Sequence, residues 1–456
     1  MTAARAELEA LFGEALRAVD PALAVARSVE RRGSRLWLAG EPLPDGMPCV
    51  VVAAGKAAAA MAAAFEARAM DRIARGVAVT KDAHGRPLST LQLREAGHPL
   101  PDARSEAAGL EVLALAASAG PDDALIVLLS GGASALLTTP QPGLRLAELR
   151  ETTDLLLRAG AAIHELNCVR KHLTRVSGGR LAIATRAARV VVLAISDVPG
   201  DDLATLASGP CAADPTRFAD ALAVLQSRGV IEQVPAAVRR HLEAGAAGRG
   251  DESAKPGDAA LARVRSVLLA SNRDALAAAA AAAQARGFDA RVVTDRLRGE
   301  ARLAGRRLAA LARALRPGPP RLLLAGGETT VTVRGRGRGG RAQELALAAA
   351  IELAGDLRVA LLAAGTDGTD GPTDAAGAHA DGHTLARGNA AGVDAHAALA
   401  DNDAHGFFAR EGGCWFTGPT GTNVMDLVLV RVAGAVQEAD PARAPRGVPL
   451  RGVQLS

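Results

Sequence analysis

The chain has 456 residues, which exceeds the size at which one hydrophobic core usually stops growing, so two domains with a cleft between them are expected. Its composition is 49% apolar but only 2% aromatic, which leaves few rings on which single-stranded nucleic acid could stack. The formal net charge of +4 is small and the arginines are dispersed, so we expect no nucleic-acid partner. No continuous apolar run reaches the roughly twenty residues that span a membrane, and we expect a cytoplasmic protein.

The first half of the chain alternates helical and β-type patterns. Residues 7–28 have the spacing of an amphipathic helix, and short apolar runs then alternate with helices rich in Ala, Leu and Arg. Continuous apolar runs joined by helices are typical of a parallel sheet covered on both faces. The pattern therefore predicts a Rossmann-like, doubly wound and mostly parallel α/β domain. Its expected strands are residues 49–54, 76–80, 124–130 and 189–196.

The second half repeats the alternation after a charged, Gly-rich stretch at residues 243–256, which suits a surface connection. We place the boundary near residue 240, with a first domain at 1–240, a smaller α/β domain at 241–456, and the active site in the cleft between them. The alanine run at 277–283 is expected to be a crossover helix, because Ala is the best helix former. The strands predicted here are residues 264–270, 290–294, 321–325, 329–333, 359–363 and 425–432.

A lysine follows the first predicted strand of the first domain. Residues 49–54 run into Gly55 and Lys56 and then into a helix. Open α/β sheets bind ligands at the carboxyl edge of parallel strands, and helix N-termini favour anions, so Lys56 is a candidate phosphate ligand. A surface lysine at a helix start would have the same spacing.

A glycine pair between serines follows the strand predicted at residues 124–130. Glycines at this position let backbone N–H groups approach a phosphate, and the serine hydroxyls add further donors. A tight turn alone would also explain the glycines. The candidate phosphate-binding residues of this loop are Ser130, Gly131, Gly132 and Ser134.

Three carboxylates, Asp197, Asp201 and Asp202, follow the strand predicted at residues 189–196. Carboxylates at a strand end suit Mg²⁺ binding or a base beside a substrate hydroxyl. The last two would also serve as caps of a following helix, which is a purely structural role. We favour a catalytic function for Asp197.

An arginine-rich segment occupies residues 334–341 of the second half, close behind Glu328. Residues 335–340 satisfy the pattern G-x-G-x-x-G that is typical of dinucleotide-binding turns. Four arginines within eight residues nevertheless suit an oligophosphate or carboxylate ligand better, and a ribose-binding acid is poorly placed. We therefore expect anion binding here, with Arg341 at the start of the next helix.

An acidic loop follows the strand predicted at residues 359–363. Asp367, Asp370 and Asp374 alternate there with Gly and Thr, which provides hard oxygen ligands for Mg²⁺ or a polyol. A structural turn would use the same residue types. His379 lies further along in a Gly-rich stretch, and we expect it at the surface.

Taken together, these segments resemble the class II glycerate kinase (glycerate 2-kinase) family over nearly the whole chain, and the C-terminal segments resemble its MOFRL domain. Each motif is modest alone, but their order along one chain is specific. The matching segments are residues 54–57, 130–134, 169–173, 196–202, 208–210, 326–329, 339–344 and 365–374.

The resemblance implies transfer of a phosphoryl group from ATP to D-glycerate, with Mg²⁺ required and 2-phosphoglycerate formed. The family's essential lysine falls on Lys56 and its essential arginine on Arg341. Phosphoryl transfer depends chiefly on positioning and on neutralisation of phosphate oxygens, which agrees with both assignments. We expect Asp197 to orient or deprotonate the 2-hydroxyl, and Glu328 and Asp367 to hold Mg²⁺ directly or through water.

Two alternatives and one departure accompany the resemblance. Members of the family have also been labelled hydroxypyruvate reductases, which would use NADH or NADPH, and a non-catalytic sugar-phosphate sensor is a third possibility. Ser177 stands where a basic residue is expected before a glycine pair, which argues against phosphate binding by that turn. The expected partners are glycerate and ATP alone, with a homodimer as a possible assembly.

Overall fold

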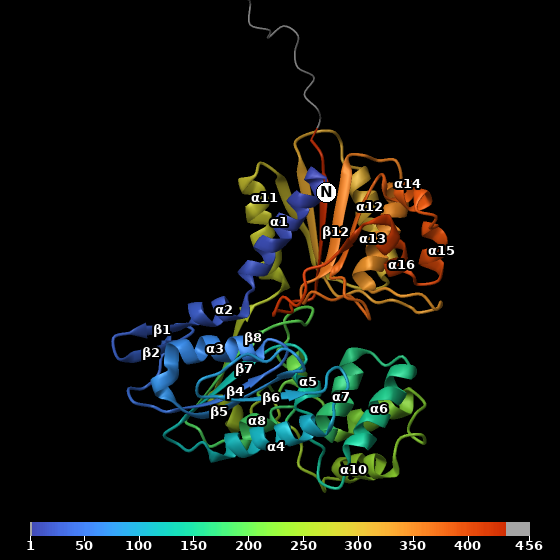
Figure 1. Ribbon diagram of the computed structural model, residues 1–456. Helices are drawn as coiled ribbons and strands as arrows, with labels where there is room; N and C mark the ends of the chain where they lie inside the picture. Colours follow the sequence, from blue (N-terminus) through green and yellow to red (C-terminus); the bar gives the residue numbers. More distant parts are fainter. Residues whose placement is uncertain (1, 435–456) are drawn as a thin grey trace, which may run out of the picture.

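The computed structural model describes residues 2–434, which form two bodies that each contain a six-stranded sheet (Figure 1). Met1 and residues 435–456 belong to the expected domains but lie outside the described residues. The prediction of two α/β domains is confirmed. A small antiparallel sheet flanks the first body and consists of β1 (Val29–Arg32), β2 (Arg35–Leu38) and β3 (Glu41–Pro42).

The first sheet is entirely parallel and has the strand order β6-β5-β4-β7-β8-β9. Counted from β4, this is the Rossmann order 3-2-1-4-5-6, so the order reverses between β4 and β7. All residues of these two central strands are buried, as the apolar runs predict. The bounds are β4 (Cys49–Ala54), β5 (Ile73–Lys81), β6 (Gln92–Ala96), β7 (Ala124–Leu129), β8 (Arg189–Ile195) and β9 (Val264–Ala270).

Strand β9 corrects the expected distribution of strands between the two halves. We expected residues 264–270 in the second sheet, but β9 pairs in parallel with β8 of the first sheet. From β4 onward the chain thus enters the second body only after Ala270. The charged segment before β9 packs on the first body. The N–H of Asp214 donates to the carbonyl of Ala254, and the N–H of Ala254 donates to the carbonyl of Gly178.

The helices of the first body cover its sheet and form a helical extension beside it (Figure 1). Among residues 2–434, no helix combines the length and apolar character needed to cross a membrane. The bounds are α3 (Ala58–Ala69), α4 (Ala103–Ser118), α5 (Ala133–Leu136), α6 (Leu146–Arg158), α7 (Ile163–Leu173), α8 (Arg180–Ala184), α9 (Phe218–Ser227) and α10 (Ala236–Ala246), with 3₁₀ turns at Met70–Arg72, Leu206–Ser208 and Ala259–Arg263.

The second sheet is mixed and has the order β10-β11-β15-β12-β13-β14. Only β10 and β11 pair in parallel, whereas the other neighbours are antiparallel. The strands are β10 (Asp289–Leu297), β11 (Arg321–Gly327), β12 (Val359–Gly365), β13 (Gly377–Asp381), β14 (Cys414–Trp415) and β15 (Asp426–Val432). The helices are α11 (Asn272–Ala285), α12 (Ala301–Arg313), α13 (Arg341–Leu353), α14 (Thr384–Ala390), α15 (Ala395–Ala400) and α16 (Ala404–Glu411).

The strand predicted at residues 329–333 is absent, because the segment forms one bridge, from Thr330 to Glu300, and is otherwise a loop. The position beside β11 is taken by β15. The backbone N–H groups of Arg334 and Gly335 instead donate to the Asn402 side chain, at 2.7 and 3.0 Å. A side chain thus satisfies the backbone groups that directly follow the expected strand.

The N-terminal helix packs on the second body, against elements that lie far from it in the sequence. The helix expected at 7–28 is divided into α1 (Ala3–Ala18) and α2 (Pro21–Ser28), since Asp20 caps a new helix at Pro21. Figure 1 shows α1 beside α11 and β12. His379 was wrongly expected at the surface: it is buried in β13, and its Nε2 lies 3.0 Å from a carboxylate oxygen of Glu9 in α1.

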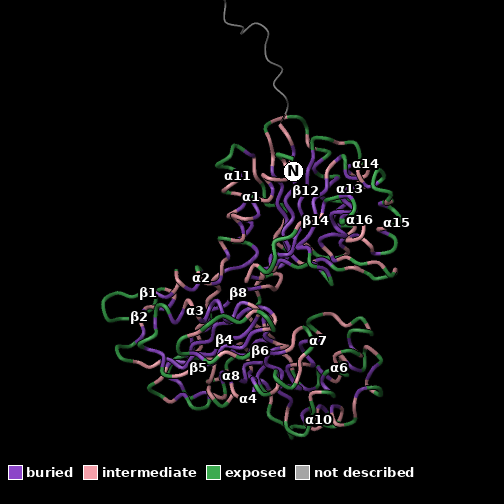
Figure 2. The backbone as a smooth tube through the Cα atoms, in the orientation of Figure 1, coloured by how far each residue is buried: buried purple, intermediate pink, exposed green. Residues whose placement is uncertain are grey.

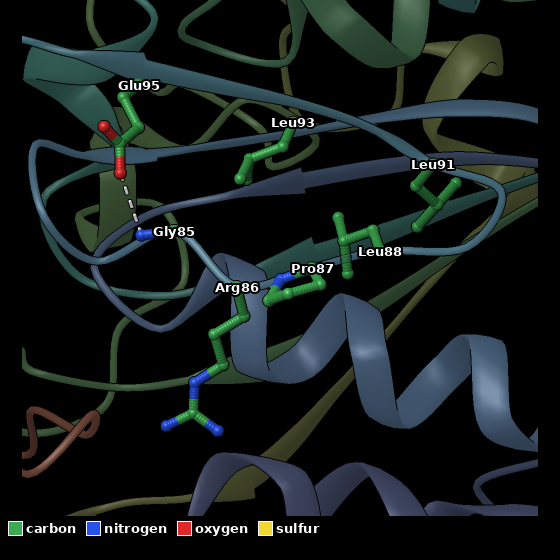
Figure 3. Close-up of a pocket in the computed structure, with 7 residues that line it drawn as sticks. All are labelled: Gly85, Arg86, Pro87, Leu88, Leu91, Leu93 and Glu95. Carbon is green, nitrogen blue, oxygen red and sulfur yellow. Dashed lines mark hydrogen bonds between the residues drawn. The ribbon is translucent and has the colours of Figure 1, made fainter.

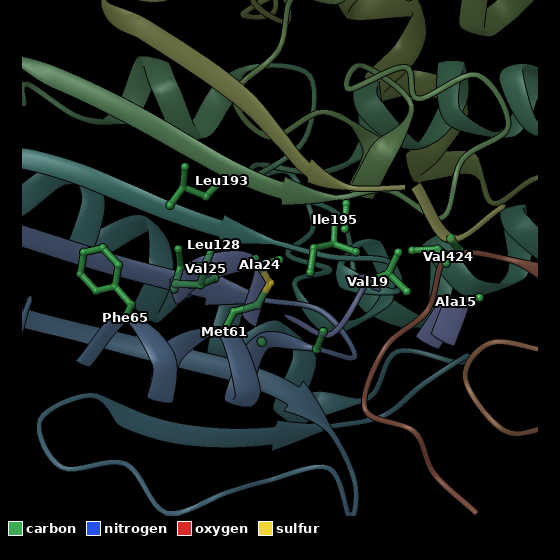
Figure 4. Close-up of a cluster of buried hydrophobic side chains, with 14 of the residues drawn as sticks. Ala15, Val19, Ala24, Val25, Met61, Phe65, Leu128, Leu193, Ile195 and Val424 are labelled. Carbon is green, nitrogen blue, oxygen red and sulfur yellow. The ribbon is translucent and has the colours of Figure 1, made fainter. Parts of the chain in front are cut away.

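One apolar core joins the two bodies. Buried residues follow both sheets in Figure 2, and one cluster includes Phe65 and Leu193 of the first body as well as Leu362 of the second. Figure 4 shows Val19 close to Ile195 and Val424, where α1 leads into α2. The chain therefore passes between the two bodies at the α1–α2 and β9–α11 connections, and both connections lie within a shared core.

Phe12 tests the role of α1. Its ring is fully buried and meets Trp415 edge to face, with centroids 4.9 Å apart. We expect Phe12→Ala to lower the free energy of unfolding by about 3–5 kcal/mol, because it removes a buried aromatic ring and leaves a cavity. Urea denaturation measures this loss. Leu23→Ala, at a half-exposed position of α2, is the control, and an equal loss in both variants would contradict the packing of α1.

Candidate active site

The site begins where the strand order of the first sheet reverses. Gly55 follows β4 at φ 124°, and a Cβ atom on it would lie 2.2 Å from Oγ of Ser130, so only glycine fits. The backbone N–H of Lys56 donates to the carbonyl of Gly131 at 2.9 Å. These contacts join the loops after β4 and β7 and place Lys56 at the crevice where Rossmann folds bind ligands.

In the loop after β7, the predicted glycines and the predicted serines have different surroundings. Gly132 adopts φ 87° and lies against the His98 ring and the Lys56 side chain. The Ser130 hydroxyl is buried and accepts from the N–H of Ala57, at the start of α3. The Ser134 hydroxyl lies 2.9 Å from that of Ser208. The glycines therefore line the crevice, whereas both serine hydroxyls contact neighbouring protein groups, and phosphate binding by this loop stays a prediction.

Asp197 lies over the same loop. A Cβ atom on Gly131 would come within 1.7 Å of Oδ2 of Asp197, and Asn423 of the second body donates to that oxygen at 3.1 Å. Burial raises the pKa of Asp197 to about 6, Lys56 partly opposes this rise, and the charges of Glu328 and Asp367 add to it.

Asp202 has the structural role that we considered. Its carboxylate accepts from the N–H of Ala204 at 3.0 Å and from the Thr205 hydroxyl, which caps the next turn. Asp201 lies in the turn before it, at φ 61°. Of the three carboxylates after β8, only Asp197 is directed at the glycine loop.

An ion pair crosses from the first body to the acidic loop of the second. Lys56 Nζ donates to Oδ2 of Asp367 at 2.9 Å, and both side chains are mostly buried. Burial acts to raise the pKa of Asp367, but the charge and hydrogen bond of Lys56 and the bonds from Thr369 outweigh it and lower that pKa. Asp370 has a different task, since it accepts from the N–H groups of Ala342 and Gln343 and caps α13.

Arg341 begins α13 and lies between two carboxylates. Its Nε donates to Oδ2 of Asp426 at 2.6 Å, and Nη1 donates to Glu328. Burial raises the pKa of Asp426 to about 6, although Arg341 acts in the opposite direction. The planar guanidinium is thus held by Asp426 at the start of β15, where it can present donors to an anion.

Sequence reasoning missed Lys81, His98 and Asp426 at this site, and it indicated Asn423 only as part of a stretch, 416–423, that can line a polar pocket or turn the chain. Lys81 ends β5, and its ammonium group has no ion-pair or hydrogen-bond partner within residues 2–434. Burial lowers its pKa and Lys56 lowers it further. Burial, together with the charges of Lys56 and Lys81, also lowers the pKa of His98 to about 4, so this ring is neutral at pH 7. The strand-end position that identified Lys56 could have identified Lys81.

The carboxylates suit a hard cation without forming a complete cage. Across the part of the chain that the structure describes, no three His, Cys, Asp or Glu side chains form a ready metal cluster. Mg²⁺ usually takes only one or two carboxylates and keeps several waters, so Glu328 and Asp367 fit its donor chemistry. Their charges both raise the pKa of Asp197, which a bound cation would counteract. Magnesium binding by these two residues stays a prediction.

Fold and site together define a two-domain α/β enzyme in which charged groups from both bodies converge on the Rossmann crevice. A family described as a domain of unknown function (DUF4147) matches residues 7–243, and the MOFRL family matches residues 321–426. A glycerate 2-kinase of Pyrococcus horikoshii is 42% identical over 428 residues, which cover 92% of this chain and 96% of that protein. The chain belongs to the glycerate 2-kinase family, as the order of its motifs predicted.

Further relatives agree over most of the chain. The D-glycerate 2-kinase of Thermotoga maritima is 42% identical over 386 residues, which cover 83% of this chain and 89% of that one. The crystal structure of a Thermotoga maritima glycerate kinase superposes with a TM-score of 0.80 at 38% identity, covering 94% of this chain and 99% of that one. An Agrobacterium vitis protein, 40% identical over 94% of each chain, has hydroxypyruvate reductase as a provisional name.

The raised pKa of Asp197 gives a stability prediction. Its carboxyl group binds a proton more tightly in the folded chain than in the unfolded one, so ionisation costs stability as pH rises from about 4 to 6. We expect the free energy of unfolding of Asp197→Asn to exceed that of the wild type by about 1–2 kcal/mol at pH 7.5, a value that allows for the partial exposure of this residue. The difference should vanish near pH 3.5.

Denaturant titrations across this pH range measure the difference between the two proteins. Asp122→Asn, at an exposed position, is the control and should show no such trend. A stability difference for Asp197→Asn that does not change between pH 3.5 and 7.5 would contradict the raised pKa of this carboxyl group.

Proposed function

We propose that the chain transfers the γ-phosphoryl group of ATP to the 2-hydroxyl of D-glycerate, giving 2-phosphoglycerate and ADP. The observation that carries the proposal is the convergence of Lys56 and Lys81 from the first body with Arg341 from the second, beside Asp197. Cations on both sides of a partly buried crevice suit oligophosphate and carboxylate ligands. The family relationship supports the same reaction.

The first body would hold the phosphate groups. Lys56 and Lys81 extend from the ends of adjacent parallel strands β4 and β5, and Lys81 has no competing partner within residues 2–434. The glycine loop at residues 131–132 lets Asp197 and the Lys56 side chain approach its backbone closely, because neither glycine has a side chain there. Phosphoryl transfer requires this kind of neutralisation and positioning more than covalent chemistry from the protein.

The second body would orient the acceptor. Arg341 can offer its planar fork to the glycerate carboxylate or to the transferring phosphoryl group, with Asp426 fixing the plane. Asp197 has a pKa of about 6, so it is ionised at neutral pH and can accept the proton of the 2-hydroxyl. Asn423 holds one of its oxygens, which leaves the other to face the substrate.

A Mg²⁺ ion would be held by Glu328 and Asp367. When bound, it would supply further neutralisation of the phosphate oxygens. Release of Asp367 from Lys56 would free a carboxylate oxygen for the ion and an ammonium group for phosphate. A cytoplasmic location and a homodimeric assembly stay predictions that accompany this proposal. The domain boundary that we placed near residue 240, between 1–240 and 241–456, lies too early for the sheets, because β9 belongs to the first sheet.

The strand order of the first sheet is that of dinucleotide-binding domains, which a reductase would also use. The turn after β4 has a single glycine before Lys56 and lacks the G-x-G-x-x-G fingerprint. At the end of β5, where an acid would bind ribose, Lys81 is followed by Asp82, and Asp82 pairs with Arg104. The G-x-G-x-x-G at 335–340 lies in the second body, fixed to residues 401–403. These features favour a kinase.

A coupled assay separates the two activities. We expect the purified protein to form ADP and 2-phosphoglycerate from ATP, Mg²⁺ and D-glycerate, and to lose this activity in EDTA. Enolase accepts 2-phosphoglycerate directly, so the assay should succeed with phosphoglycerate mutase omitted. A signal that requires the mutase would place the phosphate at the 3-position. Oxidation of NADH or NADPH by hydroxypyruvate without ADP formation would overturn the proposal.

A further inference from the structure

A groove with a volume of about 500 Å³ lies beside the Rossmann crevice, at the β6 edge of the first sheet. Figure 3 shows its lining: in the β5–β6 connection Leu88 lies beside Leu91, Gly85 is bonded to Glu95, and the Arg86 side chain extends away from them. Three leucines, one of them Leu88, and a proline give it an apolar surface, while Arg86 and Glu95 supply polar groups. Its volume lies within the range of small-molecule sites, which is roughly 300–1,000 Å³.

Hydrogen bonds to two carboxylates hold the groove in shape. The carboxylate of Glu66, itself buried in α3, accepts from the N–H groups of Ser89, Thr90 and Leu91 at 2.8, 2.6 and 2.6 Å. The N–H of Gly85 donates to one oxygen of Glu95 at 2.9 Å, as Figure 3 shows. The connection is therefore fixed without a ligand, and such preorganisation favours binding.

The groove borders the space around Lys56. A second cavity, of about 110 Å³, is lined by Lys56 and Ala60 and shares Gly85 and Arg86 with the groove. Pro419 and Gly421 of the second body also line it. A Cβ atom on Gly421 would lie 3.3 Å from Nη2 of Arg86, so this exposed guanidinium extends to the boundary between the two bodies.

We propose that the adenosine part of ATP occupies this groove, with its triphosphate passing Arg86 to reach Lys56. The assignment rests on the proposed kinase function and adds to it the position of the nucleotide base. The groove lies on the β5–β6 side of the reversal between β4 and β7, and Asp197 lies on the opposite, β8, side. ATP and glycerate would thus approach Lys56 from the two halves of the first sheet.

The chemistry of the lining fits a purine nucleotide. The leucines offer apolar contact to a flat base, and the Glu95 oxygen that does not bond Gly85 can accept from an amino or hydroxyl group. Within residues 2–434 the Arg86 guanidinium has no ion-pair or hydrogen-bond partner, which leaves it available for a phosphate. Together with Lys56 and Lys81 it gives three cations along the path of a triphosphate.

Two probes and two variants test the position of the base. The probes are the non-hydrolysable analogue AMP-PNP and inorganic tripolyphosphate, each titrated calorimetrically with Mg²⁺. Leu88→Asn removes apolar contact without adding charge, so Kd should rise about tenfold for AMP-PNP and stay unchanged for tripolyphosphate. Arg86→Gln should weaken both probes about tenfold. Leu110→Asn, at a half-exposed position of α4, is the matched control and should change neither Kd.

Photolabelling of the unaltered protein with 8-azido-ATP gives a second measurement that needs no variant. We expect the labelled peptide to contain residues 85–95. An unchanged AMP-PNP affinity in a folded Leu88→Asn, or a label in the second body, would overturn the position of the base but leave the kinase proposal intact. Failure of the wild type to bind AMP-PNP at all would instead contradict the proposed function.

Discussion

The ion pair between Lys56 and Asp367 is the contact on which the organisation of the site depends. Lys56 stands at the reversal of the first sheet, and within residues 2–434 its ammonium group finds a partner only in the second body. A half-buried charge without a partner is costly, so the acidic loop stabilises the lysine when no anion is present. In the proposed reaction a phosphate would take over this role.

The two bodies can present such a pair because they share structural elements. Helix α1 packs on the second sheet although it precedes the first, and β9 completes the first sheet immediately before α11 enters the second. Asn272, at the start of α11, donates to the carbonyls of Val424 and Asp426 at 2.7 and 3.1 Å. The joint between the sheets is thus bonded to the segment that carries Asn423 and Asp426, two of the groups at the site.

The sequence predicted the buried strands because continuous apolar runs leave few alternatives to a parallel sheet. It also located Lys56 and Asp197, since both follow such strands directly. The assignment of β9 failed, because local pattern contains no information about which sheet a strand joins. The predicted strand at 329–333 failed for a related reason: its pattern was suitable, but β15, a hundred residues later, occupies the place beside β11.

The missed site residues show the same limit. Asp426 begins a strand and reads as an ordinary polar end residue, and its role appears only when Arg341 folds against it. Asn423 gains its partner Asp197 from the other body. The groove at residues 85–95 depends on Glu66, whose carboxylate holds a loop more than twenty residues away, and no spacing rule connects the two. Contacts between distant segments decide all three.

The most direct test of the account is the turnover of Lys56→Ala with ATP, Mg²⁺ and D-glycerate. Lys56 has its charged group in the crevice and no role in the apolar core, so the variant should keep its circular dichroism spectrum and lose nearly all ADP formation. Arg158→Ala removes one exposed positive charge from α6 and should retain normal turnover. A folded Lys56→Ala with near-normal kcat would contradict the central position of this lysine.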